Sequence, residues 1–308
     1  MFLKLKSHLS AEARRLDAAP IAGARLHFLC LALIATAAPT PLALAHGDLH
    51  EQITALAEAI AKDANNPELY LRRAELNRLH GDWAAAQRDI DRARELAPDL
   101  PVIDLALGRL LLDTKRFTGA EEALDRFLIR TPGHVEGSIA RGRARMGAGE
   151  PLAAADDFGR AIERAQTPEP EYYIDQAHAF SAAGPEHIPE ALAALDRGMT
   201  KLGKLVTLGL YAVELECARK NFDAALERLD ALSATQPRKE AWCERRGDVL
   251  DAAGRSDEAK AAYQAGLEAI KSLPPHIQST AAVQQRKERL EFKLKDTGPA
   301  VRQRPDHL

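Results

Sequence analysis

A period of 34 residues is the feature of this sequence that most restricts its fold. Bulky, small and helix-breaking residues recur together at this spacing, in phase with one another. The recurring positions are Trp83 and Phe117; Ala86, Ala120 and Ala154; and Pro98 and Pro132. A sequence period of 20 to 50 residues is typical of a solenoid, in which each repeat is one supersecondary unit stacked on the next.

The residues of one period predict two antiparallel helices joined by a tight turn. Ala74 and Ala86 are small enough to let two helices approach closely at their crossing point. Gly81 suits the left-handed end of the first helix, and Asp82 can cap the start of the second. Pro98 cannot continue a helical hydrogen-bond ladder and is expected to follow the end of the second helix.

The segment from Asn66 to Pro98 closely resembles a tetratricopeptide repeat, with its small residues, its Gly-Asp-aromatic turn and its terminal proline. The same landmarks continue over about 66–274, and the chain is identified as a member of this family, of an exported bacterial type. The resemblance implies an all-α, right-handed α-solenoid of about six helix-turn-helix units with flanking N- and C-terminal helices. Low aromatic content (5%) agrees with a helical composition rich in small residues.

We expect a short helix over 46–65, six repeats over 66–274, and a capping helix with a disordered tail over 275–308. In the N-terminal helix the apolar face is formed by Leu49, Ile53, Leu56 and Ile60. In the C-terminal helix we expect Ala281, Leu290 and Leu294 to point inward. Both helices would shield the ends of the stack from water.

Residues 1–45 have the pattern of an export signal. Basic residues precede the uncharged apolar run Leu26–Ala35, and Ala43 and Ala45 fit signal-peptidase cleavage before His46. An uncleaved anchor, or a lipoprotein modified at Cys30, are the alternatives. The pattern predicts a periplasmic or secreted protein, which would touch the membrane only through this segment if it is not cleaved.

Charge and cysteine content limit the partners. Five of the 42 basic and two of the 45 acidic residues lie in 1–45, so the remaining chain carries a net charge of −6. Without a basic tract, nucleic acid is not an expected partner. Beyond the signal only Cys217 and Cys243 occur, which we expect to be buried thiols without a disulfide.

Resemblance to the family implies that the first helix of each repeat lines an inner groove. The fifth place of successive repeats is apolar until the last, and the ninth place is cationic in the middle of the array. The groove residues predicted in this way are Leu71, Leu105, Arg109, Ile139, Arg143, Ile174, His178 and Leu210. An extended or helical peptide with apolar anchors and central acidic groups would suit such a groove.

Two alternatives for these residues stay open: the apolar positions could serve packing between helices, and the cations could pair with neighbouring carboxylates. The carboxylate clamp of chaperone-binding relatives is excluded. Its Lys, Asn and Arg positions are occupied here by Leu71, Glu75, Ala106, Glu136 and Ala140.

No motif for catalysis is present, neither a phosphate-binding loop nor a dinucleotide, zinc-protease or serine-hydrolase signature. We therefore expect no enzyme activity, no cofactor and no small-molecule substrate, and we expect the many carboxylates to lie on exposed helix faces. One metal-binding alternative remains at the predicted mature N-terminus, where His46, Asp48 and His50 could bind copper or zinc.

Three functions follow as hypotheses. The first is a non-catalytic scaffold that binds other proteins of the cell envelope. The second is a metal-handling accessory protein that uses the N-terminal histidines. The third is a subunit that positions the catalytic partner of an envelope enzyme complex.

Overall fold

The structure, a computed structural model, describes residues 41–296, with side chains from Leu49 onward. The chain divides into two units, residues 1–44 and 45–308. Apart from the start of the first helix, everything described below belongs to the second unit. Residues 41–296 form fifteen α-helices and one short 3₁₀ helix, without a strand. The prediction of an all-α solenoid is confirmed.

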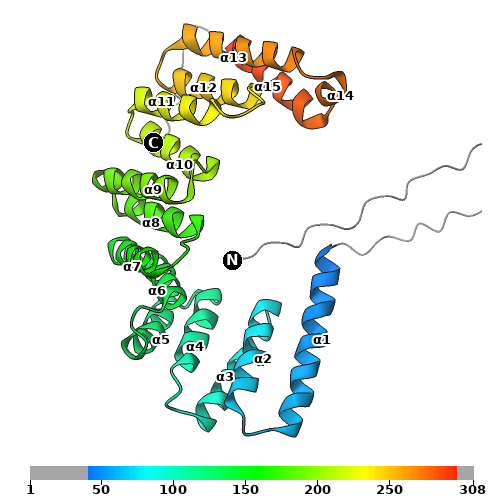
Figure 1. Ribbon diagram of the computed structural model, residues 1–308, viewed down its shortest axis with the longest axis vertical. Coiled ribbons are helices and arrows are strands. Elements are labelled where there is room, and N and C mark those ends of the chain that lie inside the picture. Colours follow the sequence, from blue (N-terminus) through cyan, green and yellow to red (C-terminus); the bar gives the residue numbers. More distant parts are fainter. Residues whose placement is uncertain (1–40, 297–308) are drawn as a thin grey trace, which may run out of the picture. The chain divides into compact units, whose positions relative to one another are not determined.

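Six helix pairs make up most of the second unit, and each pair corresponds to one predicted repeat. Their colours follow one another in chain order along the stack (Figure 1). The pairs are α2 (Pro67–His80) with α3 (Trp83–Leu96), α4 (Val102–Asp113) with α5 (Phe117–Arg130), α6 (Val135–Ala148) with α7 (Pro151–Arg164), α8 (Pro170–Ala183) with α9 (Ile188–Leu202), α10 (Val206–Ala218) with α11 (Phe222–Ser233), and α12 (Glu240–Ala252) with α13 (Ser256–Lys271).

The turn of the first repeat has the local chemistry that the sequence predicts. The Asn66 side chain caps α2 by accepting the N–H of Glu68. Gly81 ends α2 in the left-handed region, with φ of 85°, where a residue without a Cβ is favoured. The side chain of Asp82 then accepts the N–H of Ala85 and so caps α3.

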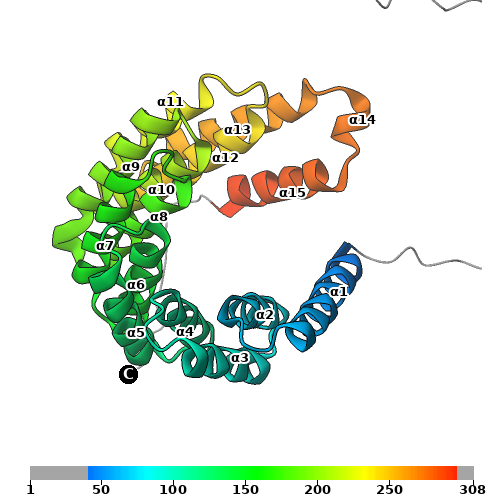
Figure 2. The same cartoon turned by 60° about the horizontal axis from the view of Figure 1, so that its bottom comes forward.

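Small residues allow the helices to pack closely. Ala74 and Ala86 are almost completely buried in one core cluster, and Ala120 and Ala154 are equally buried in later repeats. From α2 to α13 each helix packs against the next, and α2, α4 and α6 also contact one another in sequence (Figure 2). Neighbours in sequence are therefore neighbours in space, as in other solenoids.

The fourth repeat departs from the others at its turn. Residues between α8 and α9 form the 3₁₀ helix η1 (Pro185–His187) there. After the sixth repeat, a short α14 (Pro275–Gln278) leads into α15 (Ala281–Asp296), which packs on α13.

The inward face of α15 differs in part from the prediction. Leu290 is fully buried and Leu294 is half-buried, as expected, but Ala281 is exposed. Val283 is buried in its place. Ala281 is the first residue of the helix, on the side of α15 opposite Leu290, so it cannot reach α13.

At the other end, α1 (Pro41–Lys62) includes the predicted N-terminal helix. Ile60 is buried against the first repeat, whereas Ile53 and Leu56 are half-buried. No helix within residues 41–296 is long and apolar enough to cross a membrane. Most of the predicted signal and the tail 297–308 lie outside the described residues.

Buried carboxylates correct one expectation. Most acidic side chains are exposed, but five are buried between helices: Asp89, Asp157, Glu216, Glu240 and Glu244. A buried carboxylate is tolerated only when it is paired and hydrogen-bonded. Helical periodicity shows which residues of a helix face inward. It does not show which arginine of a neighbouring helix will neutralise a carboxylate on that face, so these burials could not be predicted.

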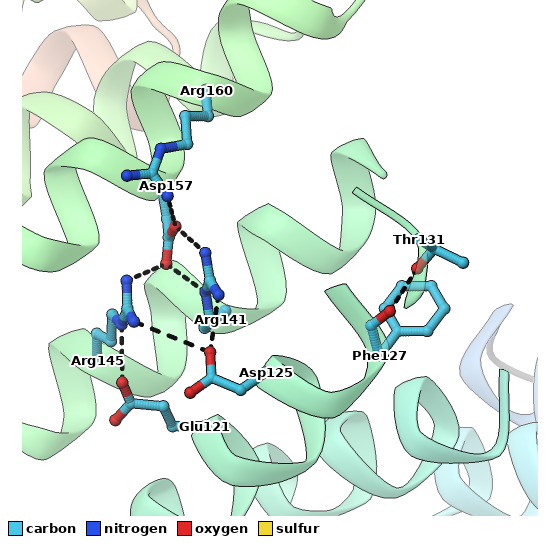
Figure 3. A network of polar contacts seen from close by, with 8 residues as sticks. All are labelled: Glu121, Asp125, Phe127, Thr131, Arg141, Arg145, Asp157 and Arg160. Atoms are coloured by element: carbon cyan, nitrogen blue, oxygen red, sulfur yellow. Dashed lines mark hydrogen bonds and ion pairs between the residues drawn. The ribbon is translucent and has the colours of Figure 1, made fainter. Parts of the chain in front are cut away.

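Asp157 is the centre of the largest of these networks (Figure 3). Its carboxylate on α7 accepts hydrogen bonds of 2.6 and 2.8 Å from Arg141 and one of 2.8 Å from Arg145, both on α6. The same two arginines reach Asp125 and Glu121 on α5. The network holds α6 between the second helices of two repeats.

Candidate protein-binding groove

An open hollow of about 580 Å³ lies along the first helices of four consecutive repeats, α2, α4, α6 and α8. Its volume is within the range of ligand sites in proteins. It is lined by Arg78, Arg109, Leu112, Asp113, Phe117, Glu136, Ile139, Ala140, Arg143, Glu169 and Tyr172.

On one side the hollow is cationic. Arg78 is held by a paired contact, with its Nε and Nη2 2.8 and 2.9 Å from the two carboxylate oxygens of Glu75. It also contacts Asp113 on α4. The hydrogen bond from Arg78 is the main cause that lowers the pKa of Glu75, so this carboxylate is ionised at neutral pH.

Two other arginines in the hollow are less fully paired. The guanidinium of Arg109 is 3.9 Å from Glu75, whose oxygens are already engaged by Arg78, and it makes no hydrogen bond to any described residue. Arg143 donates to Asp175 from Nε and Nη2, at 3.0 and 2.8 Å. Its side chain is 53% exposed, and its Nη1 has no acceptor within the described part of the chain.

On the other side the hollow is acidic. Glu169 forms no ion pair with any described residue and is exposed. Glu136 lies 3.4 Å from Nδ1 of His134, but that nitrogen accepts the N–H of Gly137 and has no proton to donate. Neither carboxylate therefore pairs with a lysine or an arginine among the described residues.

Apolar side chains also line the hollow. Ile139 is buried, Leu112 is half-buried, and the ring of Phe117 stands at the start of α5. The ring lies directly on the backbone of Gly147, where a Cβ would be 2.3 Å from a ring carbon. This contact fixes the aromatic ring in position beside the arginines.

Comparison with known proteins assigns the fold to a family. Residues 188–296 match the family described as "Tetratricopeptide repeat-like domain", and residues 80–135 and 105–170 match "Tetratricopeptide repeat". The chain belongs to the tetratricopeptide repeat family. No curated protein sequence matches it.

Solved structures support the same tetratricopeptide fold. The C-terminal part of a tetratricopeptide repeat-containing protein from Cytophaga hutchinsonii is 14% identical, with a TM-score of 0.59. That match covers 80% of this chain and 96% of the other. PilW, described as a widely conserved type IV pilus biogenesis factor, is 20% identical over 62% of this chain and 88% of its own, with a TM-score of 0.54.

In this tetratricopeptide array the predicted groove residues divide into two groups. Arg109, Ile139 and Arg143 line the hollow together. The others lie outside it: Leu71, Leu105, Ile174, His178 and Leu210. The three leucines and the isoleucine of this second group are buried or half-buried in core clusters, so they pack between helices. The side chain of His178 is exposed.

Several lining residues were not singled out from the sequence. Counted from Pro67 and Pro101, Arg78 and Leu112 occupy the twelfth place of their repeats, and Glu136 occupies the second place of the repeat that begins at Val135. Comparing those places along the chain would have found them. No such signal marks Glu169 or Tyr172, because they enter the hollow at the junction between repeats.

At the C-terminal end of the array, α15 covers the corresponding positions of the sixth repeat. Glu244, at the fifth place, accepts hydrogen bonds of 3.0 and 2.9 Å from Arg286 and Arg289. Lys293 contacts Asp248, at the ninth place, at 2.6 Å. The groove positions of this repeat are therefore occupied by the chain's own helix.

The remaining predicted sites have simple outcomes. Cys217 and Cys243 are free and half-buried, and burial raises the pKa of both thiols. Of the predicted metal ligands, the side chains of His46 and Asp48 lie outside the described ones, and that of His50 is exposed. No group of three metal-binding side chains occurs among the described residues. Members of this family are in general non-catalytic scaffolds that bind other proteins.

Proposed function

We propose that the protein is a non-catalytic scaffold of the cell envelope that binds a peptide segment of a partner protein in the hollow of repeats one to four. The single observation that carries the proposal is the hollow itself. It combines apolar surface with arginine and glutamate side chains that lack full partners. Charged groups in this condition are available to bind another molecule.

The envelope location rests on the sequence of 1–45, with its basic start, its apolar run and its small residues at Ala43 and Ala45. Intact mass measurement of the protein from its own host tests this part. A chain that begins at His46 and fractionates outside the cytoplasm is expected. An unprocessed chain recovered with cytoplasmic proteins would contradict it.

Site-specific photo-crosslinking tests the groove. A photoreactive phenylalanine analogue at Tyr172, which is half-buried in the hollow, is expected to crosslink a defined partner in the native host. The same analogue at Ile129 provides the control, since this side chain is 80% exposed on α5 and does not line the hollow. Equal crosslinking from both positions, or from neither, would contradict binding in the groove.

A further inference from the structure

The cationic and acidic sides of the hollow lie at a definite spacing. Glu136 and Arg143 are seven residues apart on the same helix, α6, which corresponds to about 10 Å along its axis. Arg109 reinforces the cationic side from α4, and Glu169 reinforces the acidic side from the start of α8.

Tyr172 also lines the hollow and is influenced by both sides. Burial raises the pKa of its hydroxyl, and the carboxylates of Glu169 and Glu136 raise it further, whereas Arg143 lowers it. The phenol is therefore within electrostatic reach of the acidic pair and of the arginine. A segment lying across it would meet opposite charges at its two ends.

The charges are only partly neutralised from within the fold, since Arg109 lies 3.9 Å from Glu75 and Arg143 is hydrogen-bonded to Asp175. Arg109 makes no hydrogen bond to any described residue, and Nη1 of Arg143 is likewise without an acceptor in the described part of the chain. Glu169 forms no ion pair there, and Glu136 lies 3.4 Å from a nitrogen of His134 that already accepts the N–H of Gly137. An arginine presents several donors in a rigid fork that matches a carboxylate, so this side favours an acidic group.

The spacing of the two sides matches a short extended segment. Four residues of extended chain span about 10 Å from the first to the last, the same as the distance along α6 between Glu136 and Arg143.

We propose, resting on the function proposed above, that the hollow recognises an extended internal segment of a partner protein. This segment carries an acidic side chain for Arg109 and Arg143, a basic side chain three residues away for Glu136 and Glu169, and an apolar side chain between them for Ile139. The recognised unit is therefore a short motif with one charge of each sign. A free C-terminal carboxylate is not required.

A random 12-residue peptide library tests this motif. The library is displayed on phage as an N-terminal fusion, so that no peptide has a free C-terminus, and it is selected against the full 308-residue chain. Enriched peptides are expected to carry acidic and basic residues three positions apart with an apolar residue between. Their affinity, measured by fluorescence polarisation, is expected to fall as ionic strength rises.

Matched double variants locate the binding. Arg109→Gln with Arg143→Gln is expected to weaken the enriched peptides at least tenfold, and Glu136→Gln with Glu169→Gln to weaken them several-fold. The controls make the same charge changes at exposed residues outside the hollow. Arg88→Gln with Arg130→Gln, and Glu122→Gln with Glu163→Gln, are expected to change affinity less than twofold.

A charge reversal separates recognition from misfolding. Arg109→Glu with Arg143→Glu is expected to lose the original peptide and to bind a version in which the acidic residue is lysine. The motif would be overturned if the enriched peptides lacked the charge pair, or if none of the four substitutions in the hollow changed their affinity. Either result would still allow the protein to bind a peptide elsewhere in the groove. Absence of any enriched peptide would instead count against the proposed function itself, and the motif would fall with it.

Discussion

At the scale of single residues, the fold depends on glycines on which an aromatic ring lies. Gly247 in α12 is the clearest case, because a Cβ there would stand 2.2 Å from a ring carbon of Tyr263. The ring is 2% exposed, and its hydroxyl donates a 2.9 Å hydrogen bond to Asp248. The ring therefore has no free space to move into.

We expect Gly247→Ala to destabilise the sixth repeat by about 1–3 kcal/mol, the usual cost of overpacking a closely packed core. The measurement is the urea midpoint followed by circular dichroism. Gly119→Ala is the control, since its Cβ would lie 3.4 Å from the nearest atom of Leu111 and alanine favours the helix. A similar loss in both variants would contradict this explanation.

Asp157 makes a second prediction at this scale. It is fully buried and accepts hydrogen bonds from Arg141 and Arg145, so Asp157→Asn leaves two guanidiniums without their shared charge partner. We expect a loss of about 3–5 kcal/mol. Asp125→Asn, which removes a 42% exposed carboxylate from the same network, should cost at most about 1 kcal/mol. The free energies of unfolding of the two variants, measured in urea, test this difference.

At the scale of elements, ion pairs attach the last helix to the sixth repeat. Burial acts to raise the pKa of Glu244, but hydrogen bonds from Arg289 and Arg286 outweigh it and the pKa lies below its ordinary value. The folded state therefore binds a proton less readily than the unfolded state. This contribution to stability is complete above the ordinary pKa of glutamate and is lost as pH falls through the lower folded value.

We expect the contact of α15 with α12 to weaken when pH is lowered from 7 to about 3.5. The chain has two tryptophans, so in a Trp83→Phe background the fluorescence comes from Trp242 in α12 and reports on this contact. The urea midpoint of the Trp242 fluorescence change should fall as pH is lowered, and Glu244→Gln should reduce that fall. Glu288→Gln, at an exposed position of α15, should leave it unchanged.

At the scale of the whole molecule, each repeat of the second unit contacts mainly its neighbours, so stability is a sum of local terms rather than one cooperative quantity. The buried side chains form separate clusters along the stack. Damage to one repeat should therefore remain local.

Leu250→Ala tests this. The side chain is 1% exposed in the cluster of α10–α15, and its truncation typically costs about 2–5 kcal/mol. Hydrogen exchange should become faster in α12, α13 and α15, while amides of α3–α5 keep their protection. Equal loss of protection in both regions would show that the stack unfolds as one unit.

The repeat, the helix pairs and the turns could be predicted from the amino-acid sequence alone. Gly81, Asp82 and Pro98 act on the backbone within a few residues of themselves, and the 34-residue period repeats their effect along the chain. Local chemistry of this kind does not depend on what other helices do, so it can be recognised without them.

The tertiary structure decided which charges are buried and which face the hollow. Asp157 and Glu169 are both acidic residues twelve positions apart, yet one is enclosed by two arginines of α6 and the other is open to solvent. Ile139 lines the hollow, whereas Leu105, at the same place of its repeat, does not. These differences depend on how side chains of separate helices meet across repeats, and no spacing along the chain contains that information.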